Sequence, residues 1–180
     1  MNKTALTYQD YEALPNDGRR YEIHDGELSV TPAPTPQHQI ISARLFTALT
    51  RWVETHPGGL LLYSPLDVIL ANTSIVQPDI VYLAADRLNR VSRRGIEGAP
   101  TLTVEILSPS TRTVDRVTKT RLYARYEVPF LWLVDPDART IEAFVLHEGR
   151  YALGVAATAT EPVDLPPFTR LGLVPDTLWP

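Results

Sequence analysis

Four charged residues stand in segments where packing would favour apolar side chains. Asp79 opens one apolar run, Glu105 lies inside another, and Glu22 stands in a predicted hairpin. The fourth, Lys119, lies on a predicted helix. A carboxylate on a buried strand is costly unless it is paired, hydrogen-bonded or bound to a metal ion. We therefore expect these side chains to form a site with acid–base or metal-dependent chemistry.

Lys119 is unusual because the chain uses arginine almost everywhere else. It has fifteen arginines and two lysines, the other being Lys3. An ammonium group is compact and approaches one water or one phosphate oxygen as a point charge, which the guanidinium fork does not. Asp115, Lys119 and Tyr123 follow one another at i,i+4 spacing, so a helix would place them on one face. The same spacing also fits an ordinary helical ion pair, and both interpretations stay open here.

Several classes of site are excluded by residue type. The chain has no cysteine, which rules out disulfides, thiolate zinc sites, iron–sulfur clusters and cysteine nucleophiles. It has no Gly-rich phosphate loop, no dinucleotide fingerprint and no Gly-x-Ser-x-Gly motif. His24, His56 and His147 lack the spacing of a zinc site. What remains is an oxygen-ligated metal, a histidine, a serine or an acid–base pair.

Length and hydropathy predict one globular domain over residues 1–180. The 180 residues are 44% hydrophobic and 21% charged, enough to bury a core. No run of 18 apolar residues occurs, and the N-terminus lacks the apolar stretch of a signal peptide. We therefore expect a cytoplasmic protein with no membrane partner.

The net charge of −4 argues against a protein that coats nucleic acid by bulk electrostatics. The charge is uneven, however, because residues 87–125 contain nine basic and three acidic side chains. A solvated basic face would show the same pattern. The candidates for phosphate contacts in this region are Arg87, Arg90, Arg93, Arg94, Arg112 and Arg116.

The elements that must position these residues follow from periodicity and turn signals. Thr7 and Asp10 predict the start of a short helix, and Asp25-Gly26 predicts a hairpin turn within residues 20–30. Helices are also predicted over residues 37–56 and 114–126. Strands are predicted over residues 60–63, 66–70, 80–83, 101–107, 130–134, 140–146 and 151–155. The order predicts an α/β fold, a mixed sheet flanked by helices.

The pair Pro78-Asp79 and the later Glu105 resemble the PD-(D/E)XK nuclease superfamily, in which a lysine two residues after the glutamate completes the site. Leu107 occupies that position here. The surrounding segments resemble the Uma (Uma-two) family of restriction endonucleases, in which the lysine has moved to the following helix, at Lys119 here. The resemblance covers roughly residues 7–178. The segments that carry it are Tyr21-Glu-Ile-His-Asp-Gly-Glu27, Pro34-Thr-Pro-Gln-His38, Glu105-Ile-Leu-Ser-Pro-Ser-Thr111, Asp115-Arg-Val-Thr-Lys119, Leu122-Tyr-Ala124, Val128-Pro129 and Leu131-Trp-Leu-Val-Asp135.

The resemblance implies a restriction-endonuclease-like fold and a metal-dependent nuclease that cuts DNA. Asp79, Glu105 and the backbone carbonyl of Ile106 would hold Mg²⁺ or Mn²⁺, a hard cation that prefers oxygen ligands. Lys119 would orient or deprotonate the attacking water, or stabilise charge on the phosphate. Glu22 would complete the catalytic set by holding a metal-bound water or a second ion.

Around that site, Asp115 and Tyr123 would support the lysine, and His38 would either cap its helix or position a water. The resemblance also implies a homodimer, and no organic cofactor is expected. Two alternatives stay open: a catalytically silent nucleic-acid-binding or regulatory module on the same fold, and a structural or dimerisation domain.

Overall fold

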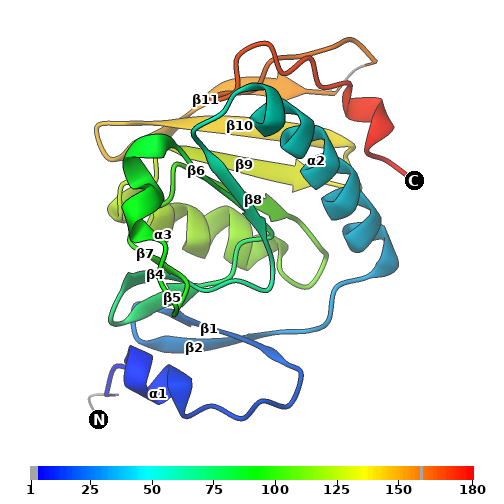
Figure 1. Cartoon of the computed structure of the whole chain (residues 1–180). Coiled ribbons are helices and arrows are strands. Elements are labelled where there is room, and N and C mark those ends of the chain that lie inside the picture. The colour runs from blue at the N-terminus through cyan, green and yellow to red at the C-terminus, as the bar shows by residue number, and fades with distance from the viewer. Residues whose placement is uncertain (1–3, 159) are drawn as a thin grey trace.

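The strands form two mixed sheets in the computed structural model, which describes residues 4–158 and 160–180 (Figure 1). The larger sheet has the order β11-β10-β9-β8-β6-β3 and the smaller has the order β2-β1-β5-β4-β7. The larger sheet comprises β3 (Leu60–Tyr63), β6 (Ile80–Leu83), β8 (Leu102–Ile106), β9 (Phe130–Asp135), β10 (Thr140–His147) and β11 (Arg150–Ala157). The smaller comprises β1 (Arg20–His24), β2 (Glu27–Thr31), β4 (Val68–Ala71), β5 (Ser74–Val76) and β7 (Ile96–Glu97). The α/β class is confirmed, with two sheets in place of the one expected.

The longest helix, α2 (Pro36–Thr55), agrees closely with its prediction. It begins where the Thr35 side chain accepts a hydrogen bond from the His38 amide at 3.2 Å, with Pro36 in the first turn. The other helical elements are short. They are α1 (Tyr8–Glu12), η1 (Ala85–Arg90), η2 (Val114–Lys119), α3 (Thr120–Arg125) and η3 (Pro175–Thr177). No helix within the described ranges is long and apolar enough to cross a bilayer.

Strand β9 is buried along nearly its whole length, and its alternating side chains pack on both faces of the larger sheet. Trp132 and Val134 point into one core with α2 and the C-terminal segment. Leu131 and Leu133 point to the opposite face, into a core shared with α3 and the smaller sheet. Figure 1 shows α2 lying across one face of the larger sheet, with α3 on the other side. Side chains that alternate along β8 therefore reach different environments.

The two sheets are joined by a short crossing segment that positions the site. The chain leaves β5 in the smaller sheet, passes through Gln77 and Pro78, and enters β6 in the larger sheet. Asp79 stands at this crossing, where its amide donates to the Val104 carbonyl at 3.0 Å. Strands β6 and β8 are antiparallel neighbours with Ile80 opposite Val104. Asp79, directly before β6, and Glu105, on β8, therefore come from neighbouring strands.

The helix predicted over residues 114–126 begins as a π-helix. Residues 114–119 form the π-helical η2, which continues directly into α3. A π-helical turn adds a residue to the α-helical repeat, and such turns are frequent at functional sites. The Thr120 hydroxyl donates to the Asp115 carbonyl at 3.0 Å, which ties the two ends of this segment together.

Candidate functional site

Charged side chains from both sheets and from η2 converge in one buried cluster. Glu22 comes from β1, Asp79 from the crossing between the sheets, Glu105 from β8, and Asp115 and Lys119 from η2. All five are buried, with at most 4% of any residue exposed. The structure therefore brings together the four charged residues that stood out in the sequence and Asp115, which was predicted on the same helix face as Lys119.

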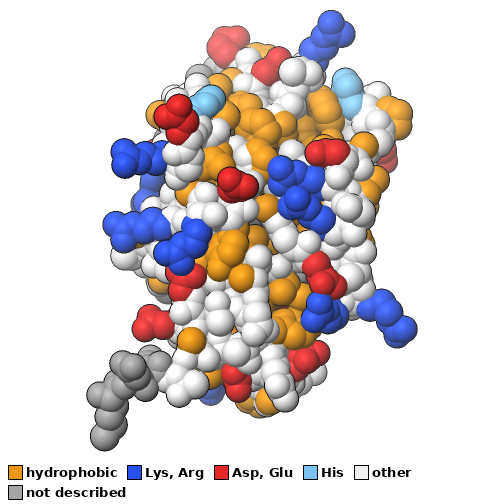
Figure 2. Space-filling model, turned by 90° about the vertical axis from the view of Figure 1, so that its left-hand side faces the viewer, with side chains coloured by type: hydrophobic (Ala, Val, Ile, Leu, Met, Phe, Trp, Pro, Cys, Tyr) orange, Lys and Arg blue, Asp and Glu red, His pale blue; other side chains and the backbone are white. Residues whose placement is uncertain are grey.

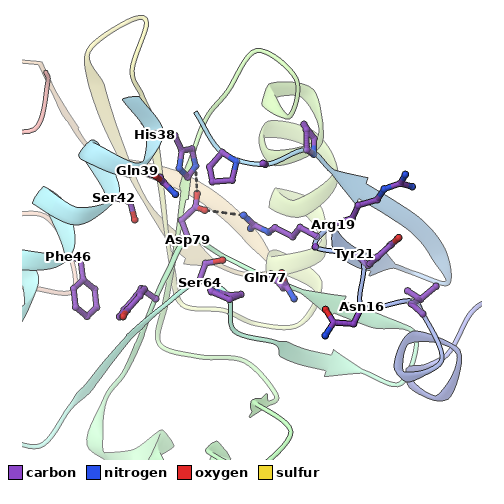
Figure 3. A pocket seen from close by; sticks show the side chains of 18 of the residues that line it. Asn16, Arg19, Tyr21, His38, Gln39, Ser42, Phe46, Ser64, Gln77 and Asp79 are labelled. Atoms are coloured by element: carbon purple, nitrogen blue, oxygen red, sulfur yellow. Dashed lines mark hydrogen bonds and ion pairs between the residues drawn. The ribbon is translucent and has the colours of Figure 1, made fainter. Parts of the chain in front are cut away.

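Asp79 is held by three donors at the end of the crossing segment. Its Oδ2 accepts a hydrogen bond from the Ile106 amide at 2.8 Å and lies 3.1 Å from the His38 Nε2. Its Oδ1 lies 3.3 Å from a guanidinium nitrogen of Arg20 (Figure 3). Burial favours the neutral acid, but His38, Arg20 and the Ile106 amide outweigh it and hold the pKa of Asp79 below its usual value.

Glu105 faces η2 and α3 because its neighbours Val104 and Ile106 point into the opposite core. The Lys119 ammonium lies 3.2 Å from both of its carboxylate oxygens, and the Tyr123 hydroxyl donates to Oε1. Burial, reinforced by the nearby carboxylates against the charge of Lys119, raises the pKa of Glu105 to about 8. The predicted shared face of Asp115, Lys119 and Tyr123 is confirmed, since all three side chains gather at this cluster.

Lys119 is the cation at the centre of the cluster. Its Nζ lies 2.9 Å from Glu22, 3.2 Å from Glu105 and 3.4 Å from Asp115. Burial alone would lower the pKa of Lys119, but the three carboxylates overcome it and raise the pKa above its usual value. The predicted i,i+4 ion pair of Asp115 and Lys119 is present, at 3.4 Å. It is not an isolated helical pair, however, because both side chains are buried and the lysine has two further carboxylate partners.

Glu22 links the cluster to the smaller sheet. It accepts a hydrogen bond from the Gln77 amide at 2.7 Å and lies 3.2 Å from the His24 Nε2. Burial opposes its ionisation, yet the charge of Lys119 and the contacts with His24 and Arg20 lower the pKa of Glu22. Glu22 is therefore a charged partner of Lys119, oriented by the backbone at the crossing between the sheets.

Two residues of the site, Arg20 and His24, were not predicted from the sequence to belong to it. Arg20 and His24 stand two residues before and after Glu22, and alternation along β1 places all three on one face. Arg20 contacts Asp79 at 3.3 Å and Glu22 at 3.8 Å, while its buried Nε has no hydrogen-bond partner among the described residues. The i,i+2 spacing of Arg20, Glu22 and His24 on a predicted strand was the sequence signal that could have placed all three on one face.

Two cavities meet at Asp79. A smaller one, of about 330 Å³, is lined by the carboxylate cluster, by β2 and by the loop of residues 108–111. A larger one, of about 1030 Å³, lies between the start of α2, β3 and the segment that precedes β1 (Figure 3). Arg20, His38 and Asp79 line both cavities, so the two are neighbours, and the rest of the cluster lies in the wall of the smaller one. The His38 side chain faces the site, and its backbone amide takes part in the helix cap.

The six arginines proposed for phosphate contacts lie outside both cavities. Arg87 and Arg90 donate to backbone carbonyls at Ala99, Arg94 pairs with Glu97, and Arg93 is exposed. Arg112 and Arg116 both contact Asp135, at 2.6 and 3.4 Å. Figure 2 shows one face of the molecule, on which several basic side chains lie near one another along one edge and others stand among acidic and uncharged ones. The structure does not gather the six around the cluster, and their role in binding stays a prediction.

The carboxylate oxygens of Asp79 and Glu105 are ligands of the type that a hard cation prefers. Across residues 4–158 and 160–180 no three His, Asp or Glu side chains are arranged as a ready metal cage. Mg²⁺, however, keeps several waters and takes only one or two carboxylates from a protein. When Glu22, Asp79, Glu105 and Asp115 are all ionised, they carry four negative charges against the two positive charges of Lys119 and Arg20, their lysine and arginine partners among the described residues. Because the pKa of Glu105 is raised to about 8, this excess of two negative charges is reached only when Glu105 loses its proton, which a bound cation would promote.

Comparison with known proteins agrees with this architecture. A protein of Anabaena variabilis described as a "putative nuclease belonging to DUF820" has the same fold, with a TM-score of 0.75 and 20% identity over 96% of this chain and 97% of that one. The "Uncharacterized protein slr1290" of Synechocystis sp. is 34% identical over 107 residues, which are 58% of this chain and 54% of that relative. The chain thus spans about half the length of this curated relative. The model of the Uma2 family, described as "Putative restriction endonuclease", matches residues 8–177, and the chain belongs to this family.

Proposed function

We propose that this chain is a divalent-cation-dependent nuclease that hydrolyses phosphodiester bonds of DNA. The observation that supports the proposal is the convergence of Asp79 and Glu105, from adjacent strands, with Lys119 in the wall of an open cavity. The descriptions of the family and of the structural neighbour both point to a nuclease. Buried charges of this kind are costly to keep, which favours a functional role for the cluster.

Asp79, Glu105 and the carbonyl of Ile106 are the proposed ligands of Mg²⁺ or Mn²⁺. The excess of two negative charges matches the charge of one divalent cation, and carboxylate and carbonyl oxygens are the ligands that such ions prefer. A cation bound there would polarise a substrate phosphate and lower the pKa of a water molecule. The Ile106 amide and His38 would keep Asp79 oriented toward the ion, since both contact its Oδ2.

Two side chains of this protein, Lys119 and Arg20, would act on the substrate, and Glu22 would position one of them. Three carboxylates around Lys119 favour its charged form, so we assign it to donating hydrogen bonds that orient the attacking water or stabilise charge on the phosphate. Glu22 would position Lys119 through their 2.9 Å contact. Arg20, with an unpartnered Nε at the junction of the two cavities, would contact a non-bridging phosphate oxygen.

A catalytically silent module is the second candidate, and one observation favours it. Lys119 is engaged by three carboxylates, and Glu105 is engaged by Lys119 and Tyr123. The cluster is thus well satisfied within the protein. A cluster whose members are paired with one another in this way could be kept for stability alone, and activity measurements separate the two candidates.

The test is cleavage of supercoiled plasmid and of single-stranded DNA in Mg²⁺ or Mn²⁺, with EDTA as the blank. Asp79→Asn, Glu105→Gln and Lys119→Met should each lower the rate by at least about 100-fold. Asp164→Asn is the matched control, because this exposed aspartate accepts backbone hydrogen bonds near the C-terminus and lies outside both cavities. Thermal melting would verify that each variant is folded at the assay temperature. Absence of cleavage by the wild type on every substrate would favour the silent module.

A further inference from the structure

The larger cavity continues from the carboxylate cluster along a groove whose walls carry aromatic rings. On one side, Phe46 of α2 and Tyr63 of β3 meet edge to face, with ring centroids 4.8 Å apart. Tyr63 is 62% exposed, which is a large fraction for an aromatic side chain beside a groove. On the other side, Tyr21 is held in place because its hydroxyl donates to Asp17 at 2.9 Å.

Asp79 lies between these two aromatic walls. Figure 3 shows Phe46, Ser42 and Gln39 to one side of Asp79, and Arg19, Tyr21 and Asn16 to the other. The groove therefore passes the proposed cleavage site and extends beyond it in both directions. Its polar lining includes the amides and hydroxyl of Asn16, Gln39 and Ser42, groups that can bond the edges of nucleobases.

The charge of the groove does not suit a double helix. Its charged lining consists of Glu12, Arg19, Arg20 and Asp79, two cations against two carboxylates. Both arginines already contact carboxylates, Arg19 at 3.5 Å and Arg20 at 3.3 Å. Affinity for duplex DNA depends mainly on lysine and arginine contacts to many phosphates. Exposed aromatic faces, in contrast, can stack only on bases that are not already stacked and paired within a duplex.

We propose that this groove binds an unpaired stretch of a nucleic acid strand. Bases would stack on the Phe46–Tyr63 pair on one side and on Tyr21 on the other, with the intervening phosphodiester beside Asp79. This inference rests on the proposed function only in placing the reacting phosphate at Asp79. It assigns single-stranded nucleic acid, or a strand opened locally, as the substrate class.

The test measures binding apart from cleavage. Fluorescence anisotropy would follow a labelled DNA single strand, and the same strand annealed to its complement, in Ca²⁺ in place of Mg²⁺. We expect the single strand to bind at least about tenfold more tightly than the duplex. Tyr63→Ala should weaken single-strand binding by about tenfold, the usual effect of losing one stacked base, while Tyr63→Phe keeps the ring and the affinity.

Leu153→Ala is the matched control. Leu153 is 54% exposed on β11, the edge strand opposite β3 in the same sheet, so both alanine substitutions remove a large exposed side chain from an edge. With two arginines in the groove, log K should fall with log salt with a slope no steeper than about −1.4. Equal affinity for single strand and duplex, a steeper slope, or equal effects of Tyr63→Ala and Leu153→Ala would each overturn the proposal.

The same experiment separates the two proposals. If the wild type binds the single strand through Tyr63 but cleaves no DNA in Mg²⁺ or Mn²⁺, the groove stands and the nuclease proposal fails. If the wild type cleaves DNA and Tyr63→Ala binds as tightly as the wild type, the nuclease stands and the groove fails.

Discussion

Removal of the Lys119 charge should expose how much of the stability depends on the buried cluster. Lys119→Met keeps an unbranched side chain of similar length but leaves the carboxylates of Glu22, Glu105 and Asp115 without their shared cation. The ammonium lies between 2.9 and 3.4 Å from these three groups, and the lysine side chain is only 4% exposed. Water therefore cannot replace the lost partner without a rearrangement of the cluster.

The expected loss of stability in Lys119→Met follows from this geometry. Breaking a buried ion pair by removing one partner costs about 3–5 kcal/mol, because an uncompensated charge stays buried. The total free energy of unfolding of a protein of this size is about 5–15 kcal/mol. At roughly 2–4 °C per kcal/mol for domains of about 150–250 residues, the melting temperature should fall by about 6–20 °C.

The assay is thermal and urea denaturation of Lys119→Met beside Arg121→Met. Arg121 is exposed on α3, so its substitution removes a cation from the same helical segment and should change stability by no more than about 0.5 kcal/mol. A divalent cation should raise the melting temperature more in Lys119→Met than in the wild type, because the variant has one more negative charge in excess. Equal melting temperatures of Lys119→Met and Arg121→Met would refute the assignment of Lys119 as the central cation.

Three further outcomes follow from other contacts. Mg²⁺ or Mn²⁺ at about 100 times its dissociation constant should stabilise the wild type by about 2.7 kcal/mol, and Asp79→Asn should abolish the resulting rise in melting temperature. A wild-type melting temperature that does not change with the metal would contradict the proposed metal site. Asp135→Asn should cost about 1.5–3 kcal/mol at neutral pH in urea unfolding, because Asp135 is buried against two arginines. Burial opposes the ionisation of Asp135, but hydrogen bonds and those two arginines lower its pKa. The loss of stability in Asp135→Asn should therefore persist above about pH 4 and disappear as the pH falls through the lowered pKa. An equal loss at pH 7 and pH 3 would refute the pairing. Gly95→Ala should lower the free energy of unfolding by about 1–3 kcal/mol more than Gly149→Ala, as measured by thermal melting. Both glycines have positive φ, but of the two only Gly95 would place a Cβ against a backbone carbonyl, that of Asp67. Equal losses would contradict the close approach of Gly95 to the Asp67 carbonyl.

The elements that the sequence predicted well are those with a long or regular hydrophobic pattern. Helix α2 was expected over residues 37–56 and spans Pro36–Thr55, because its apolar stripe and its proline and glycine boundaries are local signals. Strands β5 and β7 were missed, since they are only three and two residues long. Strand β1 joins β5 through the pairing of Ile23 with Ile75, a long-range contact with no local signature, and this pairing divides the strands between two sheets.

The site was predictable wherever charge conflicted with packing. Asp79 and Glu105 stood out because apolar neighbours surround them, and Lys119 because the chain otherwise uses arginine. Arg20 did not stand out, since an arginine before a hairpin is ordinary in isolation. Its role depends on the distance to Asp79, which lies 59 residues away along the chain. The gathering of a cluster from two sheets is a tertiary property that no local pattern contains.

The position of Leu107 explains physically why the lysine of this site comes from a helix. Glu105 and Leu107 are two residues apart, so they point to the same side of β8. Leu107 is 2% exposed and packs in the apolar core between the larger sheet, the smaller sheet and α3. A lysine at 107 would bury its charge among those apolar side chains, whereas η2 brings Lys119 to Glu105 from the charged side. Leu107→Lys combined with Lys119→Met should therefore destabilise the fold further and should not restore activity; recovery of cleavage in this double variant would show that the strand position can still serve the chemistry.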